Sequence, residues 1–389
     1  MNVLIVSNGH GEAAIAGYLG RALLERAPSA RVDHFPLVGE GEESPRGVTI
    51  VGPRKRMPSG GLVAYWNFKN LMRDVGAGLP ILVARQDAFL SRQRERDVVV
   101  AIGDVYCLAT CLLFARRPTI FVATAKSQYV ASHSRLECAI ARLARVVFAR
   151  DAETARSLQA RGVNAHFAGN LMMDGVAAAP GTLERALDPH ALRVAVLPGS
   201  RDDAPANATA AIRRARLLAA RIAPQRVQAL VSMAPGVSLA MLVDAAARAG
   251  VALERIANAD CVAARGAQDS LDVLAIAGCF GELVRACDVV LGQAGTGNEQ
   301  AAGLGKPVIA WSQASTPGKL GWYRMRQQRL LGDALLVLPD DDGAFVDGVA
   351  ALLGDSERTQ AMSRAGRERM GDPGGSNAVA EAVLTLASE

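Results

Sequence analysis

The sequence predicts an α/β protein with two doubly wound, parallel-sheet domains that face a cleft. Short apolar segments rich in β-branched residues alternate with helical patterns along almost the whole chain. This alternation is typical of βαβ units with right-handed crossovers. It is interrupted once, near residue 180, and then starts again. The length of 389 residues also favours two domains over one.

In the first half, apolar runs predict six strands, at residues 2–7, 31–37, 97–102, 119–123, 145–149 and 164–168. A helical pattern follows the first strand as far as about Ala27. Asp151 as a cap, with Glu153 in the first turn, predicts the start of a helix between the last two strands.

An Ala-, Pro- and Gly-rich stretch separates the halves. We expect a first domain at residues 1–176, a linker at 177–190, a second domain at 191–370, and a C-terminal helix within 371–389 that could pack back on the first domain. In the second half we expect strands at residues 192–197, 226–232, 251–256, 271–276, 288–291, 308–311 and 335–338, and terminal helices at 355–370 and 377–386.

The composition fits an ordinary globular protein, with 50% hydrophobic and 21% charged residues. No apolar run approaches the roughly 20 residues that span a bilayer, and no basic segment precedes the first strand, as it would in a signal peptide. We therefore expect a cytoplasmic protein. The six cysteines form neither a paired framework nor a zinc motif, which favours buried free thiols.

The charge is uneven along the chain. Residues 1–175 carry 22 Lys and Arg against 15 Asp and Glu, a balance of +7, whereas the remainder carries 21 against 23, a balance of −2. A basic first domain suggests an acidic partner, and an anionic membrane surface is one candidate. A solvated basic face without a partner is the alternative. No nucleic-acid partner is expected, because the excess is modest and no recognition motif is present.

Basic and aromatic side chains are mixed between Arg54 and Lys69, where Tyr65, Trp66 and Phe68 fall within four positions. Such mixtures suit a lipid headgroup boundary, so this segment could dock on the inner face of a membrane and admit an amphiphilic acceptor. The alternative is a helical insert that packs Trp66 into the domain.

Two glycine-containing loops, about ninety residues apart, dominate the second half. One is Leu197-Pro198-Gly199-Ser200-Arg201, and the other runs from Gly292 through Gly295-Thr296-Gly297-Asn298-Glu299-Gln300. Each follows an apolar strand and precedes a helical pattern. In a parallel sheet, that position offers backbone N–H groups and a helix N-terminus to an anion.

The residue types in these loops suit a diphosphate. Gly199 and Gly295 would let the backbone approach phosphate closely, and Arg201 would offer a fixed fork of donors to a phosphate oxygen. The remaining loop residues would supply side-chain donors, helix caps or tight backbone: Ser200, Thr296, Gly297 and Asn298. The alternative for each loop is an ordinary turn.

Together these motifs resemble the GT-B glycosyltransferases, and most of all the lipid-A-disaccharide synthase-related group. The similarity extends over residues 7–12, 166–170, 197–201, 295–307 and 364–371. It implies a GT-B fold with a nucleoside-diphosphate sugar, first of all a UDP-sugar, bound by the second domain. The implied reaction transfers a hexosyl group to a hydroxyl of a lipid-linked or amphiphilic acceptor in the first domain, without a metal or another cofactor.

The resemblance also implies a glutamate that binds the ribose hydroxyls of the nucleotide. Counted back from Gly305, Gln300 occupies that position, and Glu299 precedes it by one residue. A helix turns about 100° per residue, so the two side chains do not point the same way. Either Gln300 binds the ribose as a neutral amide or Glu299 reaches it. The chain departs from the family again at Leu171, where a proline is usual.

The acceptor hydroxyl must lose a proton, and Asp104 is the first candidate for the base because it follows a buried strand and Gly103. Its alternative role is to cap the following helix. His10, in the Gly9-His10-Gly11 turn after the first strand, is the second candidate, and its alternative role is to shape that turn. Gly9 and Gly11 would line the acceptor site.

The acidic run Asp340-Asp341-Asp342 precedes a helical pattern, so it predicts a helix cap and not a metal site.

Two other functions remain open. A nucleotide-sugar epimerase would use the same fold, although only five histidines are available for its chemistry. A non-catalytic nucleotide-sugar-binding protein fits the departure at Gln300. Product formation separates this last case from both enzymes.

Overall fold

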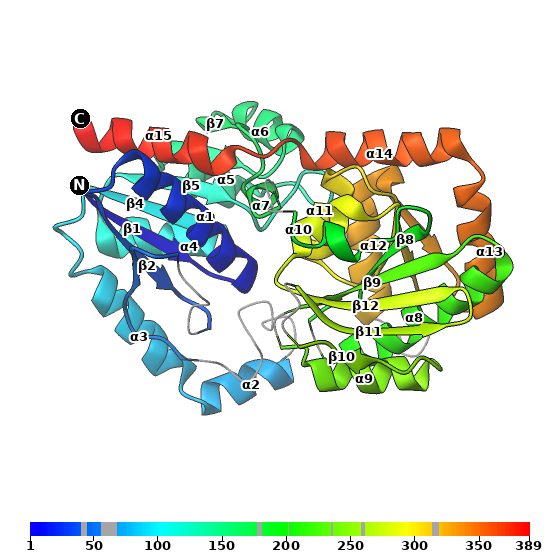
Figure 1. Cartoon of the computed structure of the whole chain (residues 1–389). Coiled ribbons are helices and arrows are strands. Elements are labelled where there is room, and N and C mark those ends of the chain that lie inside the picture. The colour runs from blue at the N-terminus through cyan, green and yellow to red at the C-terminus, as the bar shows by residue number, and fades with distance from the viewer. Residues whose placement is uncertain are drawn as a thin grey trace. The chain divides into compact units, whose positions relative to one another are not determined.

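The computed structural model describes the chain except residues 40–44, 56–67, 177–180, 201, 235, 258–260 and 313–318, and it leaves out the side chains of residues 68–70, 319, 320 and 322. The described chain forms two compact units (Figure 1). Unit 1 contains Met1–Gly175 and Gly371–Glu389, and unit 2 contains Val176–Met370. The basic and aromatic segment singled out above falls largely outside the described residues.

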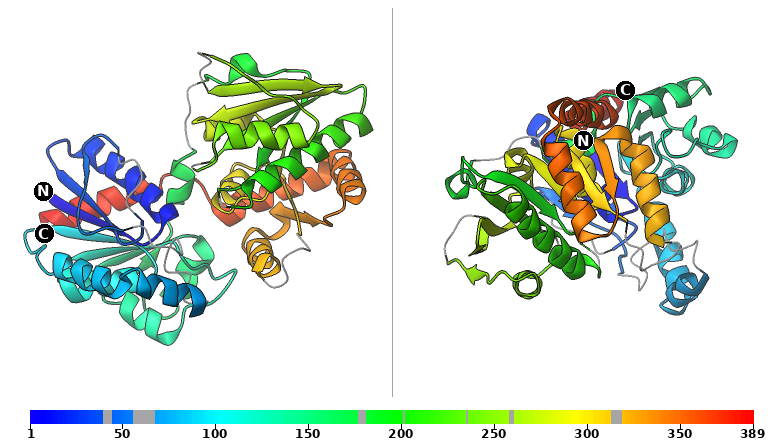
Figure 2. Two further views of the ribbon diagram at one scale, coloured as in Figure 1. Left: turned by 90° about the horizontal axis from the view of Figure 1, so that it is seen from below. Right: turned by 90° about the vertical axis from the view of Figure 1, so that its right-hand side faces the viewer.

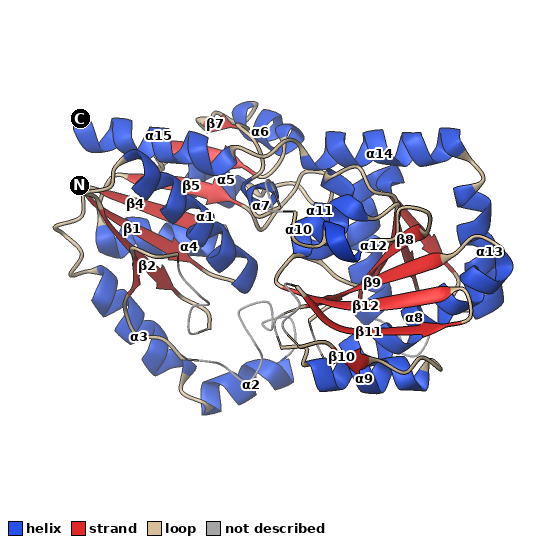
Figure 3. Cartoon of the chain, in the orientation of Figure 1, coloured by secondary structure: helices blue, strands red, loops and turns tan. Residues whose placement is uncertain are grey.

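Unit 1 is built on a sheet of seven parallel strands in the order β3-β2-β1-β4-β5-β6-β7. Strands are red and helices blue in Figure 3. The strands are β1 (Asn2–Ser7), β2 (Arg31–Pro36), β3 (Val48–Ile50), β4 (Val98–Gly103), β5 (Thr119–Ala123), β6 (Val146–Ala149) and β7 (Ala165–His166). The helices are α1 (His10–Arg26), α2 (Phe68–Gly76), α3 (Leu79–Leu90), α4 (Val105–Thr110) with the π-helical turn Cys111–Ala115, α5 (Arg135–Ala141), α6 (Ala152–Gln159), α7 (Leu171–Asp174) and α15 (Gly375–Ser388).

Both faces of this sheet are buried, which explains the continuous apolar runs of its strands. Val3 and Ile5 of β1 pack in one core with α1 and α15. Leu4 and Val6, which point the other way, pack in a second core with α4, α5 and α6. Figure 2 shows α15 beside α1 on the unit 1 sheet.

The C-terminal helix is held on unit 1 by a carboxylate. Asp174 accepts hydrogen bonds from the backbone N–H groups of Gly374 at 2.5 Å and Ser376 at 2.8 Å, at the N-terminus of α15. Gly169, at φ +100°, lies so close that an added Cβ would be 2.8 Å from the Gly375 nitrogen. The turn before α7 is therefore fitted to the backbone that enters α15.

Unit 2 contains an eight-stranded sheet in the order β10-β11-β12-β9-β8-β13-β14-β15. The strands are β8 (Leu192–Leu197), β9 (Val227–Met233), β10 (Glu254–Arg255), β11 (Val262–Gln268), β12 (Leu271–Ala277), β13 (Val289–Gly292), β14 (Val308–Trp311) and β15 (Leu335–Leu338). The helices are α8 (Ala204–Arg221), α9 (Leu239–Arg248), α10 (Phe280–Ala286), α11 (Thr296–Gly303), α12 (Lys319–Leu331), α13 (Asp342–Leu353) and α14 (Ser356–Met370), with 3-10 turns at Glu184–Ala186 and Gly332–Ala334.

One edge of this sheet corrects the expectation from sequence. β10 and β11 run antiparallel, and β11 pairs with β12. The sequence analysis missed β11 because Val262 is its only β-branched residue. Arg265 on β11 forms an ion pair with Asp272 on β12, with an N–O distance of 3.1 Å. The remaining strands are parallel, so the doubly wound arrangement holds around the centre of the sheet.

All six cysteines are free thiols, and each is buried except Cys279, which is half-buried. Among the described helices, none has both the length and the apolar character needed to cross a membrane.

His34 on β2 is a buried neutral histidine. Its Nε2 and the Ser7 hydroxyl form a hydrogen bond of 2.8 Å, and both side chains are buried. Burial, with a smaller contribution from the charge of Arg54, lowers the pKa of His34 to about 4. The unfolded chain therefore binds this proton near pH 6.5, whereas the folded chain resists it.

We predict that His34 makes the protein less stable as the pH falls from 6.5 to 4, by up to about 3 kcal/mol in total and about 2 kcal/mol by pH 5. His34→Gln should reduce this loss, because an amide does not titrate. Urea unfolding of both proteins at pH 7 and pH 5 measures the difference. Burial also lowers the pKa of His133, which acts in the same direction in both proteins. Equal pH dependence in the two proteins would contradict the prediction.

Candidate functional site

The candidate residues follow the strands at which each sheet reverses its order. In unit 1 the order changes direction between β1 and β4, and in unit 2 between β8 and β13. Ligands of doubly wound sheets bind outside the carboxyl ends of strands at this point. Gly9, His10 and Gly11 follow β1, and Asp104 follows β4. In unit 2, one glycine loop follows β8 and the other follows β13.

The two glycine loops of unit 2 meet at the switch point. Gly199 has φ +96°, a left-handed conformation that favours glycine. A Cβ added at Gly199 would lie 3.7 Å from the Gln293 carbonyl oxygen. The Gln293 N–H donates to the Leu197 carbonyl over 2.9 Å, which joins the end of β8 to the start of the second loop. The backbone segments that follow β8 and β13 therefore lie next to each other at the switch point.

Side chains from α11 and α12 brace the second loop from inside unit 2. Asn298 Nδ2 donates to the Gly292 carbonyl at 3.0 Å, and Gln327 Nε2 donates to the carbonyls of Ala294 and Gly295, each at 3.1 Å. Asn298 is completely buried. Its amide therefore acts within the protein, as part of the loop's support. Thr296, the first residue of α11, is exposed, as is Ser200 in the other loop.

A buried arginine lies behind the same loop. Arg324 on α12 is 6% exposed and donates hydrogen bonds to the side-chain oxygens of Gln293 and Gln327. Burial lowers its pKa to about 10. Arg324 was not among the residues predicted from the sequence, because it is one of several basic residues in the segment that forms α12. The spacing of three residues between Arg324 and Gln327 is the signal that could have found it.

The ribose candidates differ in exposure. Glu299 is half-buried and Gln300 is buried, so Glu299 is the more open of the two. Arg201 lies outside the described residues.

At the switch point of unit 1, Asp104 joins two strands. Its Oδ1 accepts from the Cys107 N–H at 3.0 Å, which caps α4, and from Asn8 Nδ2 at 2.6 Å. The capping role considered for Asp104 is therefore present. Gly103 has φ +137°, and an added Cβ there would overlap the Asn8 side chain. Glycine at position 103 leaves the space in which Asn8 and Asp104 meet.

Glu12 in the first turn of α1 is an acid that the sequence analysis did not propose for chemistry. Thr124 Oγ1 donates to Glu12 Oε1 at 3.3 Å. Burial raises the pKa of Glu12 and the negative charge of Asp104 adds to this, whereas the Thr124 hydrogen bond and the charge of Arg150 oppose it. The net direction is upward, so this carboxyl takes up a proton more readily than an exposed one.

Gly9 makes room for this acid, because a Cβ there would overlap the Glu12 carboxyl group. His10 is exposed, and its ring lies beside Gly39. A small cavity opens at the carboxyl ends of β5 and β6, with Thr124 and Arg150 among its lining residues. The acids, the hydroxyl and the arginine thus lie at the carboxyl ends of neighbouring strands.

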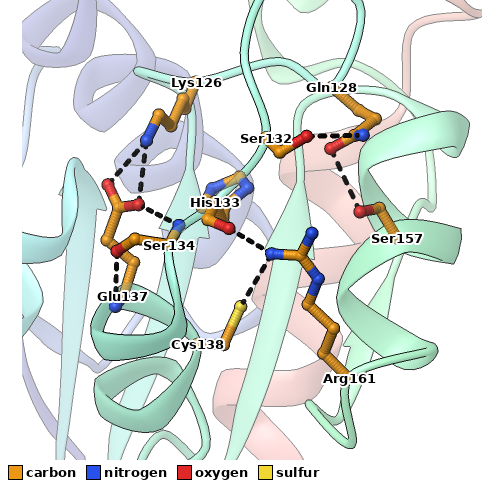
Figure 4. A network of polar contacts seen from close by, with 9 residues as sticks. All are labelled: Lys126, Gln128, Ser132, His133, Ser134, Glu137, Cys138, Ser157 and Arg161. Atoms are coloured by element: carbon orange, nitrogen blue, oxygen red, sulfur yellow. Dashed lines mark hydrogen bonds and ion pairs between the residues drawn. The ribbon is translucent and has the colours of Figure 1, made fainter.

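The segment after β5 is fixed by polar contacts (Figure 4). Lys126 pairs with Glu137 at 2.8 Å, and Glu137 also completes the capping box of α5 with Ser134. Arg161 donates to the His133 carbonyl and contacts Cys138 Sγ at 3.8 Å. These contacts hold the segment that follows Thr124 in the chain.

The acidic run before α13 has a structural role. Asp341 accepts from the Ala344 N–H at 2.9 Å and caps α13, as expected. Asp340 and Asp342 pair with Arg214 at 2.6 and 2.9 Å. Within the described residues, no group of three or more His, Cys, Asp or Glu side chains could hold a metal ion.

Comparisons with known proteins identify the fold. No protein-family model matches this chain, and no curated protein matches it. The structure is similar to that of UDP-GlcNAc 2-epimerase from Neisseria meningitidis bound to UDP-GlcNAc, with TM-score 0.56, 12% identity, and coverage of 99% of this chain and 100% of the other. It is also similar to Acinetobacter baumannii MurG, with TM-score 0.56, 14% identity and coverage of 99% of each chain.

A third similar structure is the spinosyn rhamnosyltransferase SpnG complexed with thymidine diphosphate, with TM-score 0.57, 16% identity, and coverage of 99% of this chain and 100% of the other. These identities are low, so the similarity concerns the fold. The expected GT-B fold, with two Rossmann-like domains, is confirmed.

We predict that Gly103→Ala destabilises the protein by about 1 to 3 kcal/mol, because the new Cβ adopts a strained φ and displaces Asn8 from Asp104. Gly11→Ala is the matched control, since an added Cβ at Gly11 meets no atom within 4 Å. Urea unfolding of the three proteins measures the change. Equal stability of Gly103→Ala and Gly11→Ala would show that the contact between Asn8 and Asp104 does not depend on this glycine.

Proposed function

We propose that the protein is a glycosyltransferase that moves a hexosyl group from a nucleoside-diphosphate sugar to a hydroxyl of a lipid-linked or amphiphilic acceptor. The observation that carries this proposal is the meeting of the Gly199 and Gly295 loops at the β8–β13 switch point. The similar structures include proteins whose names specify UDP-GlcNAc or thymidine diphosphate as ligand, which supports a nucleoside-diphosphate sugar as the donor. A UDP-sugar is the first choice.

In this proposal, the backbone at Gly199, Ser200 and Gly295 approaches the diphosphate. The start of α11, at Thr296 and Gly297, faces the same anion with its unpaired N–H groups. Arg201 adds a fork of donors. Glu299 or Gln300 binds the ribose, and the greater exposure of Glu299 favours it. These groups stabilise the leaving diphosphate by charge and hydrogen bonds, without a metal.

Unit 1 supplies the acceptor site, with Gly9, His10, Gly11 and Asp104 around the switch point. We add Glu12 as the base that takes the proton from the acceptor hydroxyl. The raised pKa of Glu12 brings it closer to neutral pH, where a general base works best. Asp104 Oδ1 is already used by Cys107 and Asn8, so Asp104 positions the site and tunes Glu12 through its charge.

The proposed acceptor follows from the basic first domain and from the sequence resemblance to the lipid-A-disaccharide synthase-related group. A positive balance in residues 1–175 suits an anionic, lipid-linked acceptor at the inner face of a membrane. We therefore propose a cytoplasmic protein that associates peripherally with the membrane.

Epimerisation of a UDP-sugar is the second candidate. One observation favours it: Asp104 is close enough for its charge to raise the pKa of Glu12, and epimerisation needs an acid and a base near one carbon atom. An epimerase converts the donor without an acceptor. It also exchanges the hydrogen on the carbon that inverts with solvent, whereas a transferase does neither.

We expect one UDP-sugar to bind with selectivity and without dependence on a metal. Thermal-shift and calorimetry measurements with UDP, UDP-GlcNAc, UDP-glucose, UDP-galactose, GDP and ADP, each with and without EDTA, test this. Stabilisation that survives EDTA supports the proposed donor site. If none of these nucleotides shifts the melting temperature, the two loops are structural turns and the transferase proposal fails.

We expect Glu12→Gln to lower turnover of the bound donor by about 100-fold or more, because the amide cannot accept the proton. The affinity for UDP should stay within about twofold of the wild type. Asp104→Asn keeps most of the geometry, so its smaller loss of turnover serves as the comparison.

Donor turnover is followed by NMR in D2O with and without an amphiphilic acceptor. Loss of donor only with acceptor identifies the transferase. Deuterium incorporation without acceptor identifies the epimerase. Binding without either change would identify a nucleotide-sugar-binding protein that lacks catalysis, and full turnover in Glu12→Gln would remove Glu12 from the mechanism.

A further inference from the structure

The buried arginines of the described chain differ in how their charges are compensated. Three arginines are more than nine-tenths buried in these residues: Arg96, Arg214 and Arg324. Arg96 pairs with the buried Asp33 at 2.5 Å. Arg214 pairs with Asp340 and Asp342 at 2.6 and 2.9 Å. Burial of a charge is expensive without such a partner, so these two follow the usual rule.

Arg324 departs from that rule. Its hydrogen bonds go to the neutral side chains of Gln293 and Gln327, and among the described residues no carboxylate lies within ion-pair distance of it. Asp203 is near enough to favour the charged form but makes no ion pair with it. Among the described residues, the buried charge of Arg324 is therefore not neutralised by a carboxylate in direct contact with it.

The hydrogen bonds of Arg324 connect it to the loop after β13. Gln293 is in the loop after β13, and Gln327 holds the carbonyls of Ala294 and Gly295 in that loop. Its two partners thus connect the guanidinium to the backbone that precedes α11. Gly295 also lies against the hydroxyl of Tyr323, the neighbour of Arg324 on α12. The N-terminus of α11 adds a partial positive charge beside the same loop.

We infer that Arg324 is the residue that recognises the diphosphate of the ligand at the Gly295 loop, with its charge balanced by the bound anion. This inference deepens the proposed function and rests on the donor site described there. The guanidinium supplies up to five N–H donors, of which only two are used by Gln293 and Gln327. The unused donors and the charge are what a diphosphate needs.

We expect that removing the charge of Arg324 does not lower the melting temperature of the ligand-free protein. Removing a buried charge that lacks an acidic partner costs little and can stabilise a protein, whereas breaking a buried ion pair leaves carboxylates unpaired and destabilises it. Arg324→Gln should therefore melt at or above the temperature of the wild type without ligand. Arg214→Gln, the matched control, should melt below it.

The test is calorimetric titration of the wild type, Arg324→Gln, Arg324→Lys and Arg214→Gln with UDP and with inorganic pyrophosphate. Arg324→Gln should weaken both ligands about 10- to 100-fold, which corresponds to the loss of a charged hydrogen bond. Arg324→Lys keeps the charge and should lose less. Arg214→Gln should bind both ligands as the wild type does.

The outcomes distinguish a failure of this inference alone from a failure of the proposed function. Wild-type affinity for both ligands in Arg324→Gln overturns the role of Arg324 and leaves the donor site in place. Binding of pyrophosphate but not UDP, with dependence on Arg324, supports the anion site and overturns the nucleotide-sugar function. If neither ligand binds the wild type, both fail. If Arg324→Gln and Arg324→Met both fail to fold, the charge is structural and the inference is overturned.

Discussion

The position of the first strand of each unit inside its sheet, and not at an edge, is the constraint on which the candidate site depends. Because β1 and β8 have neighbours added on both sides, the helices that follow β1 and β4, or β8 and β13, leave to opposite faces of the sheet. In such sheets this leaves a crevice at the carboxyl ends of the two adjacent strands. Gly103 and Gly199, both with positive φ, stand at these ends and allow the chain to pass closely beside its neighbour.

Features that depend on neighbouring residues in the sequence could be predicted, whereas features that depend on contacts between distant segments could not. The strands around the switch points could be predicted because β-branched runs buried on both faces are visible in the sequence, and the glycines that follow β8 and β13 are visible with them. β11 could not, because its strand conformation comes from pairing with β12 and not from its own residues. The burial of Arg324 could not either, since it results from how α12 packs behind a loop thirty residues earlier in the chain.

The arginines of unit 2 show how similar side chains acquire different roles. The guanidinium of Arg214 lies over the rings of Trp311 and Phe345, 4.7 and 4.6 Å from their centroids, and its ion pairs join α8 to the start of α13. Two carboxylates therefore balance its charge within the fold. Arg324 is almost as buried, yet the hydrogen bonds of its side chain to other described residues go to the amide groups of Gln293 and Gln327. A protein that retains such a charge accepts a cost in stability, and costs of this kind are typical of binding sites.

Both candidate sites include the N-terminus of a helix, but the surrounding charges differ between the two units. In unit 1, the first turn of α1 carries Glu12, whose ionised form the helix dipole favours but burial and Asp104 oppose. Because burial has the larger effect, the pKa of Glu12 is raised toward neutral pH, which suits the proposed role as a proton acceptor. In unit 2, the first turn of α11 faces a loop backed by Arg324, so the dipole and the side chain have the same sign. Where burial and a negative charge oppose the helix dipole, as at Glu12, the pKa of an acid is adjusted. Where a positive side chain adds to the dipole, as Arg324 does at α11, the combined charge favours an anion.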